Sequence, residues 1–235
     1  MNAFRWICVL CFGLLAASAA AKDAVFATPE QTHPLNILAA PPAEGSEQQK
    51  QELAELHKIE SERTAAQAAQ AGFDDEHEDF FLFQSVLGEK FAAENLPLTA
   101  AFGKEISADE SGNAAAAKGF FHRAHPYTVD ATLKPVCKTK TKPDSYPSGH
   151  TLVGWLLGLA LVEMIPEKRE EILARAEDYG HNRLVCGVHF PSDVQASKLL
   201  GYAAHAVEMQ NPQFRAELAA AKAEVRARLG LAESK

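Results

Sequence analysis

The feature that most constrains the fold is an apolar stretch that runs from Thr151 to Ile165. Apolar side chains cover every face of this stretch until Glu163, and Pro166 follows directly after it. A helix that is apolar all round has to be buried on every side, and about fifteen residues are fewer than the ~20 that a membrane-spanning helix needs. We therefore predict a central core helix that other helices must surround.

The rest of the chain also has the periodicity of helices, and the alternating β-branched runs typical of strands are absent. Proline stands near the expected start of several helices, where its missing N–H costs little. The expected helices span residues 47–71, 80–91, 98–106, 114–124, 166–180, 191–209 and 212–229, with residues 126–145 as a loop. The acidic run Asp74 to Asp79 is expected to be a solvated helix start. The predicted fold class is all-α, a single compact helical domain.

Residues 1–21 have the pattern of a secretory signal peptide: one basic residue, Arg5, then an apolar run and small residues up to Ala21. The alternative is a membrane anchor, for which the apolar run is short. Residues 22–44 are rich in proline and are expected to form an irregular mature N-terminus, which leaves 45–235 as the helical domain. The chain is therefore expected to be periplasmic or secreted, with no membrane contact after cleavage.

The formal net charge of −8 argues against a protein that binds nucleic acid, because such proteins neutralise phosphates with basic surfaces. Positive charge is expected to be local instead. We expect Lys118 and Arg183 to concentrate it in a pocket. The histidines are not set at the spacing of zinc ligands and no HExxH pattern occurs, so neither a metal nor another cofactor is expected.

Two segments contain the residue types that phosphoryl transfer through a histidine needs. In the second segment Asp193 follows His189 by four residues, so one helical turn brings the carboxylate to the imidazole as its orienting group. Arg183 offers a planar fork that matches phosphate oxygens. In the first segment Ser148-Gly149-His150 opens the apolar helix, where free backbone N–H groups form an anion site.

These residues carry a resemblance to a known family. The chain resembles the bacterial class A non-specific acid phosphatases, soluble members of the superfamily that includes the type 2 phosphatidic acid phosphatases and the vanadium haloperoxidases. That family has a three-part signature: Lys, six residues, Arg-Pro; Pro-Ser-Gly-His; and Ser-Arg, five residues, His, three residues, Asp. The matching residues here are Lys118 with His125-Pro126, then Pro147-Ser148-Gly149-His150, then Asn182-Arg183 with His189 and Asp193. The resemblance covers roughly residues 36 to 229.

Two positions depart from the signature. His125 stands where the family has arginine, and histidine is charged only near or below pH ~6.5. Assigning the neighbouring Arg123 to this role would break the spacing to Lys118 and Pro126, so we keep His125. Asn182 stands for serine, and its amide can still donate a hydrogen bond to a phosphate oxygen.

The resemblance implies a mechanism and a set of roles. His189 would attack phosphorus and form a phosphohistidine, Asp193 would orient it, and His150 would act as general acid and then base. The residues expected to bind the phosphate are Lys118, His125, Ser148, Gly149, Asn182 and Arg183. The expected partners are small phosphate monoesters and further copies of the chain in a homo-oligomer. The alternatives are a vanadium-dependent haloperoxidase and a non-catalytic phosphate-binding protein.

Cys137 and Cys186 are the cysteines that remain after removal of residues 1–21. An oxidising compartment favours a disulfide, and both residues approach the same site, since Cys186 lies between Arg183 and His189. We predict a disulfide between them, with two separate buried thiols as the alternative.

Because histidine replaces the family arginine, we expect the positive charge at position 125 to fade as pH rises. A bound phosphate favours the charged form of a neighbouring histidine, so substrate affinity should weaken above roughly neutral pH. The His125→Arg variant should flatten this decline, as measured by kcat/KM against pH. Identical profiles for the two proteins would contradict a role for His125 at the phosphate.

Overall fold

A computed structural model describes residues 23–232 of the chain. The predicted signal peptide at 1–21 lies outside the described residues. Within them every regular element is a helix, which confirms the all-α fold class. No helix of the described part combines the length and the apolar character required to cross a bilayer.

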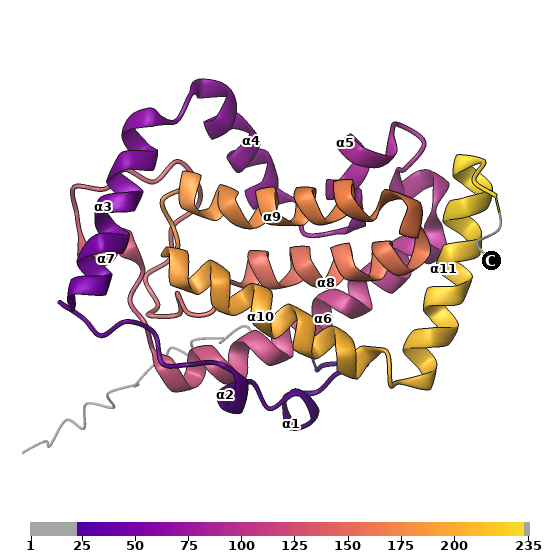
Figure 1. Cartoon of the computed structure of the whole chain (residues 1–235), viewed down its shortest axis with the longest axis horizontal. Coiled ribbons are helices and arrows are strands. Elements are labelled where there is room, and N and C mark those ends of the chain that lie inside the picture. Colours follow the sequence, from indigo (N-terminus) through magenta and orange to yellow (C-terminus); the bar gives the residue numbers. More distant parts are fainter. Residues whose placement is uncertain (1–22, 233–235) are drawn as a thin grey trace, which may run out of the picture.

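The predicted core helix is α8 (Gly149–Met164), and every side chain from Thr151 to Leu161 is buried. The helix begins at Ser148, whose hydroxyl oxygen accepts a hydrogen bond from the Thr151 N–H at 3.4 Å. Figure 1 shows α8 in the middle of the molecule, between α9 (Arg169–Val185) and α10 (Pro191–Glu208). Helices α6 (Pro97–Phe121) and α11 (Pro212–Leu229) also pack against it.

The remaining elements are short or peripheral, apart from two N-terminal helices. Helices α3 (Glu47–Glu62) and α4 (Ala65–Glu76) approach one end of α9. The others are α1 (Pro29–Thr32), α2 (Pro34–Ile37), η1 (Phe80–Phe83), α5 (Gln84–Leu87), η2 (Ala93–Asn95), α7 (Pro126–Val129) and η3 (Pro166–Lys168).

Glycine allows the close approach of α9 to α8. A Cβ atom on Gly154 would lie 2.5 Å from Cδ1 of the buried Tyr179 ring. On the neighbouring turn a Cβ atom on Gly158 would lie 3.1 Å from the Ala176 Cβ. The ring of Tyr179 therefore takes the space that a side chain at position 154 would need.

The single helix expected over residues 47–71 is wrong, because the chain bends between α3 and α4. Arg63 has extended backbone angles, and Thr64 caps the next helix by accepting from the Gln67 N–H. The Arg63 guanidinium donates to the carbonyls of Val185 and Lys134 at 2.9 and 2.8 Å. The bend is thus fixed by contacts with segments far away in the sequence.

The two helices expected at 98–106 and 114–124 are one continuous helix, α6, which ends at Phe121. Its polar middle is buried because Asp109 accepts hydrogen bonds from the backbone N–H groups of Val25, Phe26 and Ala27. His122 then ends the helix with φ of 47°. His125 consequently lies beyond the C-terminal end of the helix that contains Lys118.

The acidic run at 74–79 is a solvated helix start only at its end, where the exposed Asp79 caps η1 by accepting from the Phe81 N–H at 2.8 Å. Asp74 lies near the C-terminal end of α4 and is fully buried, in a bidentate ion pair with Arg175 at 2.6 and 3.0 Å. Burial of a carboxylate requires such a partner, and Arg175 is supplied by α9. The preference of acidic residues for helix N-termini could not predict that Asp74 pairs with Arg175.

We predict that Gly154→Ala lowers the free energy of unfolding by about 1–3 kcal/mol, because the new methyl group overlaps the Tyr179 ring. The matched control is Gly72→Ala in α4, where nothing lies within 4 Å of the position that the new methyl group would take. The control should gain about 0.5–1 kcal/mol from higher helix propensity. Urea denaturation of the three proteins measures both changes, and equal stability of the two variants would contradict the close-packing argument.

Candidate active site

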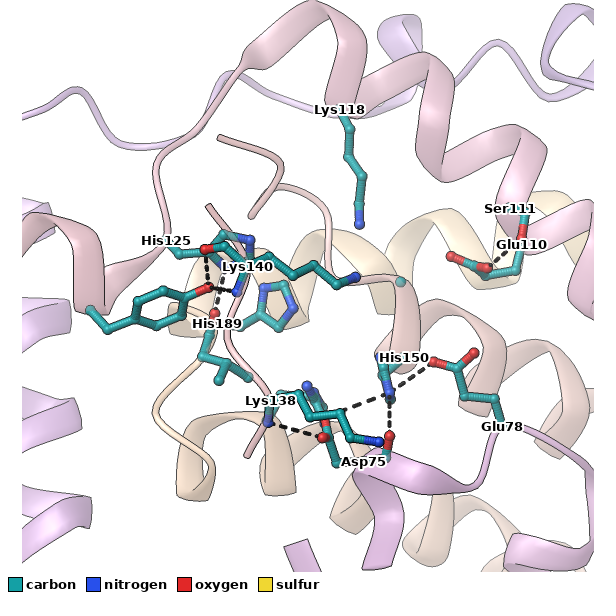
Figure 2. Close-up of a pocket in the computed structure, with 14 residues that line it drawn as sticks. Asp75, Glu78, Glu110, Ser111, Lys118, His125, Lys138, Lys140, His150 and His189 are labelled. Carbon is teal, nitrogen blue, oxygen red and sulfur yellow. Dashed lines mark hydrogen bonds and ion pairs between the residues drawn. The ribbon is translucent and has the colours of Figure 1, made fainter. Parts of the chain in front are cut away.

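A cavity of about 310 Å³ opens at the N-terminal end of α8 (Figure 2). Its walls combine six of the predicted site residues: Lys118, His125, Gly149, His150, Arg183 and His189. The other lining residues are Asp75, Glu78, Glu110, Ser111, Tyr127, Lys138, Lys140 and Val188. The cavity is thus where the three parts of the signature meet.

The His189 imidazole is buried and turned toward Asp193. Its Nδ1 lies 3.4 Å from Asp193 Oδ2, and the Ser145 hydroxyl lies 3.3 Å from the same nitrogen and donates to Asp193 Oδ2 at 2.6 Å. Among the described residues, Nε2 has no hydrogen-bond partner. Burial, together with the charge of Arg183, lowers the pKa of His189 well below its ordinary value. The ring is therefore neutral, with a free nitrogen available as a nucleophile.

Asp193 lies behind His189 and does not line the cavity. It occupies the first turn of α10, where its Oδ2 also accepts from the Phe190 N–H at 2.9 Å. Its Oδ1 accepts from Arg123 at 2.5 Å. Burial raises the pKa of Asp193, and the Arg123 guanidinium opposes this by favouring the charged form.

His125 lines the cavity, whereas Arg123 does not and instead contacts Asp193 and Glu52. The His125 Nε2 lies 2.9 Å from Asp144 Oδ1, and its Nδ1 lies 2.8 Å from the Val188 carbonyl oxygen. Both contacts are to acceptors, and an imidazole fills both only when both of its nitrogens carry a proton. Neither ring nitrogen of His125 is therefore free to contact a bound anion directly.

Lys118 points into the cavity from the last turns of α6, and Figure 2 shows it above His189 and His150. Burial lowers the pKa of its ammonium group, while the carboxylates of Glu110 and Asp144 oppose that change. Gly149 faces the same space: a Cβ atom there would lie 3.6 Å from Lys118 Nζ and 2.7 Å from Glu110 Oε1. The absence of a side chain at Gly149 keeps the helix N-terminus open to a ligand.

His150 lies on the first turn of α8 and contacts two acidic residues to which the sequence motifs gave no role. Its Nε2 is 2.8 Å from Glu78 Oε1 and 3.8 Å from Asp75 Oδ1. Burial acts to raise the pKa of Glu78, but the hydrogen bond and charge of His150 outweigh it, so that this pKa is lowered. His150 and Glu78 therefore form a close imidazole–carboxylate pair in the wall of the cavity.

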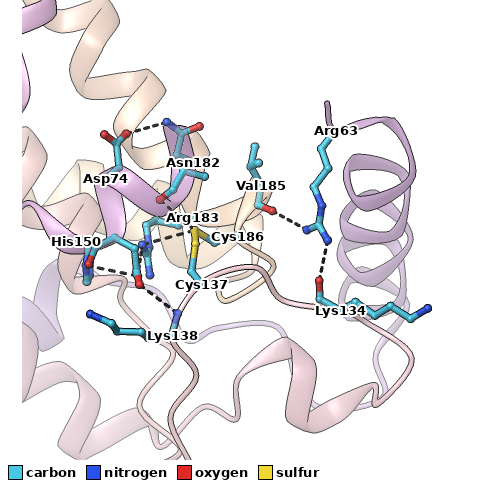
Figure 3. The surroundings of a disulfide bond; sticks show 12 residues. Arg63, Asp74, Lys134, Cys137, Lys138, His150, Asn182, Arg183, Val185 and Cys186 are labelled. Carbon is cyan, nitrogen blue, oxygen red and sulfur yellow. Dashed lines mark hydrogen bonds and ion pairs between the residues drawn. A yellow bond between two sulfur atoms is a disulfide. The ribbon is translucent and has the colours of Figure 1, made fainter. Parts of the chain in front are cut away.

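Arg183 reaches the cavity from α9 and pairs with Asp75 at 2.8 Å. Burial acts to raise the pKa of Asp75, but the guanidinium and the Lys138 backbone N–H outweigh it and lower this pKa. The predicted disulfide between Cys137 and Cys186 is confirmed, and Figure 3 shows it beside Arg183, whose guanidinium lies 3.8 Å from Cys186 Sγ. It ties the loop that supplies Lys138 and Lys140 to the end of α9.

Ser148 and Asn182 are close to the cavity but do not line it. The Ser148 hydroxyl is buried and is used as the cap of α8, and it also accepts from the Thr151 hydroxyl at 3.0 Å. The Asn182 amide donates to Asp74 Oδ2 at 2.8 Å. The structure therefore does not bring these two side chains into the cavity, although both residues were assigned to phosphate binding.

The sequence motifs did not predict the acidic side chains that line one side of the cavity. Glu110 and Ser111 come from the middle of α6, and Asp75 and Glu78 come from the acidic run that was expected to be solvated. Burial raises the pKa of Glu110 to about 7, although Lys118 acts in the opposite direction. The one signal in the sequence that could have predicted these carboxylates is the pair of basic residues expected at the site, Lys118 and Arg183. A buried cation requires a carboxylate nearby.

The fold is similar to that of a bacterial vanadium-dependent iodoperoxidase known from its crystal structure. The TM-score is 0.58 at 18% sequence identity, and the match covers 74% of this chain and 52% of the other. At this identity the likeness concerns the fold.

Curated relatives include several bacterial acid phosphatases. The chain is 32% identical over 200 residues to an acid phosphatase of Zymomonas mobilis subsp. mobilis, covering 82% of this chain and 75% of the relative. It is 38% identical over 113 residues to a non-specific acid phosphatase of Providencia stuartii, covering 46% of this chain and 45% of the relative. For a non-specific acid phosphatase of Salmonella typhimurium the values are 34% over 148 residues, with 61% and 59% covered. The chain thus spans about half the length of the last two proteins.

Residues 100–217 match the sequence family described as "PAP2 superfamily". This region contains Lys118, His150, Arg183 and His189. This match extends over half of the chain, and the Zymomonas protein is matched over three quarters of its length. The chain therefore belongs to the PAP2 superfamily.

Proposed function

We propose that the protein is an acid phosphatase that hydrolyses phosphate monoesters through a phosphohistidine at His189. The observation that carries this proposal is the state of His189: neutral, held through Nδ1 by Asp193 and Ser145, with Nε2 free beside a cationic cavity. The names of the relatives support the same activity.

The reaction needs an anion site in front of the nucleophile. Lys118 and Arg183 supply positive charge, and the Gly149 N–H lies in the open first turn of α8. These groups would surround the three equatorial oxygens of the phosphoryl group, where negative charge collects in the transition state.

In the first step, Nε2 of His189 forms a bond to phosphorus while the bond from phosphorus to the ester oxygen breaks. His150 gives a proton to the departing oxygen, which leaves as an alcohol. In the second step, His150 takes a proton from water as the water attacks phosphorus, and the N–P bond breaks to release phosphate. Asp193 stabilises the positive charge that His189 acquires.

Glu110 gives the cavity a preference for acidic conditions. Its carboxyl group is neutral below its pKa of about 7 and becomes an anion above it. A phosphate bound next to Lys118 would be repelled by that anion, so binding should weaken as pH rises through this pKa.

We also propose that the protein acts in the periplasm or outside the cell, after removal of residues 1–21, and forms a homo-oligomer. The disulfide supports an oxidising compartment. Activity in the periplasmic fraction of the native host and size-exclusion chromatography with light scattering of the mature chain test the two statements.

The catalytic proposal predicts that the wild type hydrolyses p-nitrophenyl phosphate at acidic pH without added metal, and that His189→Ala lowers kcat by at least about 10³-fold. Acid quench of the wild type with labelled substrate should trap a phosphoenzyme, and the variant should trap none. Normal turnover in the variant would contradict the mechanism. Halide oxidation by the wild type with vanadate and hydrogen peroxide, in place of hydrolysis, would favour a haloperoxidase instead.

The charge of Glu110 is tested by binding of inorganic phosphate, which needs no turnover. The ratio of the wild-type Kd to the Glu110→Gln Kd should be near one at pH 5 and rise to about tenfold at pH 9, because the amide stays neutral. Calorimetric titration measures both values, and their ratio cancels the titration of phosphate itself. The control, Glu105→Gln, changes a residue of α6 outside the cavity wall and should follow the wild type. A ratio of the two Kd values that does not change with pH would show that the charge of Glu110 does not affect binding of the anion.

A further inference from the structure

Arg123 is a buried arginine that lies outside the cavity, just after the end of α6, and connects α3 with α10. Its guanidinium donates to Asp193 Oδ1 on α10 at 2.5 Å and to Glu52 Oε2 on α3 at 2.7 Å. It also donates to the Ser192 hydroxyl at 2.6 Å and lies 4.0 Å from the centre of the Phe190 ring. The side chain is only 4% exposed, so these contacts are shielded from water.

Asp193 has no other cation in direct contact among the described residues. Its neighbours on α10 and the preceding loop are His189 and the Phe190 N–H, and the loop before α8 supplies the Ser145 hydroxyl. The charges of Lys118 on α6 and Asp193 attract each other from a distance, and the charge of Asp193 helps to raise the pKa of the nearby Tyr146 phenol. A fully buried carboxylate stays charged only when it is paired or hydrogen-bonded.

We propose that Arg123 is the positioning residue that keeps Asp193 ionised, so that His189 holds its proton on Nδ1 and presents Nε2 as the nucleophile. This inference rests on the proposed phosphohistidine function. Arg123 acts through Asp193 and touches neither the cavity nor a substrate placed in it.

The charge of Asp193 determines what it can do for His189. An ionised Asp193 accepts the Nδ1–H bond and stabilises the imidazolium that forms when the phosphoryl group is transferred. A protonated Asp193 loses that stabilising charge. Burial favours the protonated form and Arg123 favours the charged form. Without Arg123 the carboxyl group would therefore be ionised only at higher pH.

Glu52 provides a matched control within the same cluster. It pairs with the other side of the Arg123 guanidinium, and its Oε1 accepts from the Ser192 N–H at 2.8 Å. It does not contact Asp193. Loss of its negative charge leaves Arg123 in place beside Asp193. Glu52→Gln therefore removes one buried ion pair and leaves the Arg123–Asp193 ion pair intact.

The experiment compares the pH dependence of kcat in the wild type, Arg123→Met and Glu52→Gln. The acid side of each profile reports the titration of the Asp193–His189 pair as a unit. In Arg123→Met it should move to higher pH by at least about one unit, so that kcat on that limb falls about tenfold. Well above the limb, kcat should approach the wild-type value. In Glu52→Gln the limb should stay in place or move slightly to lower pH.

A loss of kcat by the same factor at every pH in Arg123→Met would overturn the proposal, because a purely structural role predicts that result. An equal upward shift in Glu52→Gln would also overturn it. If Arg123→Met does not fold because Glu52 is left unpaired, the double variant Arg123→Met/Glu52→Gln removes that unpaired charge. The double variant should show the same upward shift, and an unchanged limb in it would overturn the proposal.

A second measurement separates this inference from the proposed function. The ¹⁵N resonances of His189, assigned with His189→Gln, report the tautomer and the titration of the pair without any substrate. The wild type should show the proton on Nδ1, and the titration of the pair should move upward by at least about one pH unit in Arg123→Met. If the wild type shows no phosphatase turnover, the proposed function fails while this shift is still expected. An unchanged titration and tautomer would overturn the role of Arg123 whatever the activity.

Discussion

Every side chain of α8 from Thr151 to Leu161 is buried, and the positions of the other long helices follow from that burial. Helices α6, α9, α10 and α11 all pack against it, and glycines at positions 154 and 158 let α9 approach closely. Because the whole helix is enclosed, only its ends can reach solvent. The N-terminal end, capped by Ser148, opens into the cavity, and this is the end where an anion is favoured by the helix dipole and free N–H groups.

The cavity gathers several basic side chains, and each of the main ones has an acidic neighbour. Arg183 pairs with Asp75, His150 with Glu78, and His125 with Asp144, while Lys118 feels the charge of Glu110. Buried charges are stable only in such pairs. A phosphate that enters therefore competes with carboxylates for the same cations, and protonation of the weakest acid, Glu110, shifts that competition toward the ligand.

Much of this acidic side comes from the N-terminal third of the chain. Asp75 and Glu78, which line the cavity, lie at and just after the end of α4. Glu52 on α3 lies outside the cavity and pairs with Arg123, and all three acidic residues precede the family match at residues 100–217. Arg63 anchors the bend between these two helices to the end of α9 and to the loop before the disulfide. The N-terminal helices thus adjust the charge of the site, while the residues of the signature provide its proposed chemistry.

The sequence by itself determined the features that depend on local pattern. The apolar run predicted α8, prolines marked the starts of α10 and α11, and the four-residue spacing brought Asp193 to His189. For the helices these rules hold because helical geometry fixes which neighbours along the chain can touch. His189 lies before α10, so its contact with Asp193 is made across the start of that helix and not within one of its turns. The disulfide was also predictable, since the expected compartment and the position of Cys186 favoured it.

Only the tertiary structure decided which polar residues are buried and with what partner. Asp74 meets Arg175 across 101 positions of sequence, and Asp109 meets Phe26 across 83. For the same reason the sequence could not show that α6 is continuous or that Arg123 reaches both Glu52 and Asp193. A polar side chain can be solvated or paired, and the local sequence does not distinguish the two. The choice is made when distant helices pack together and remove water from the pair.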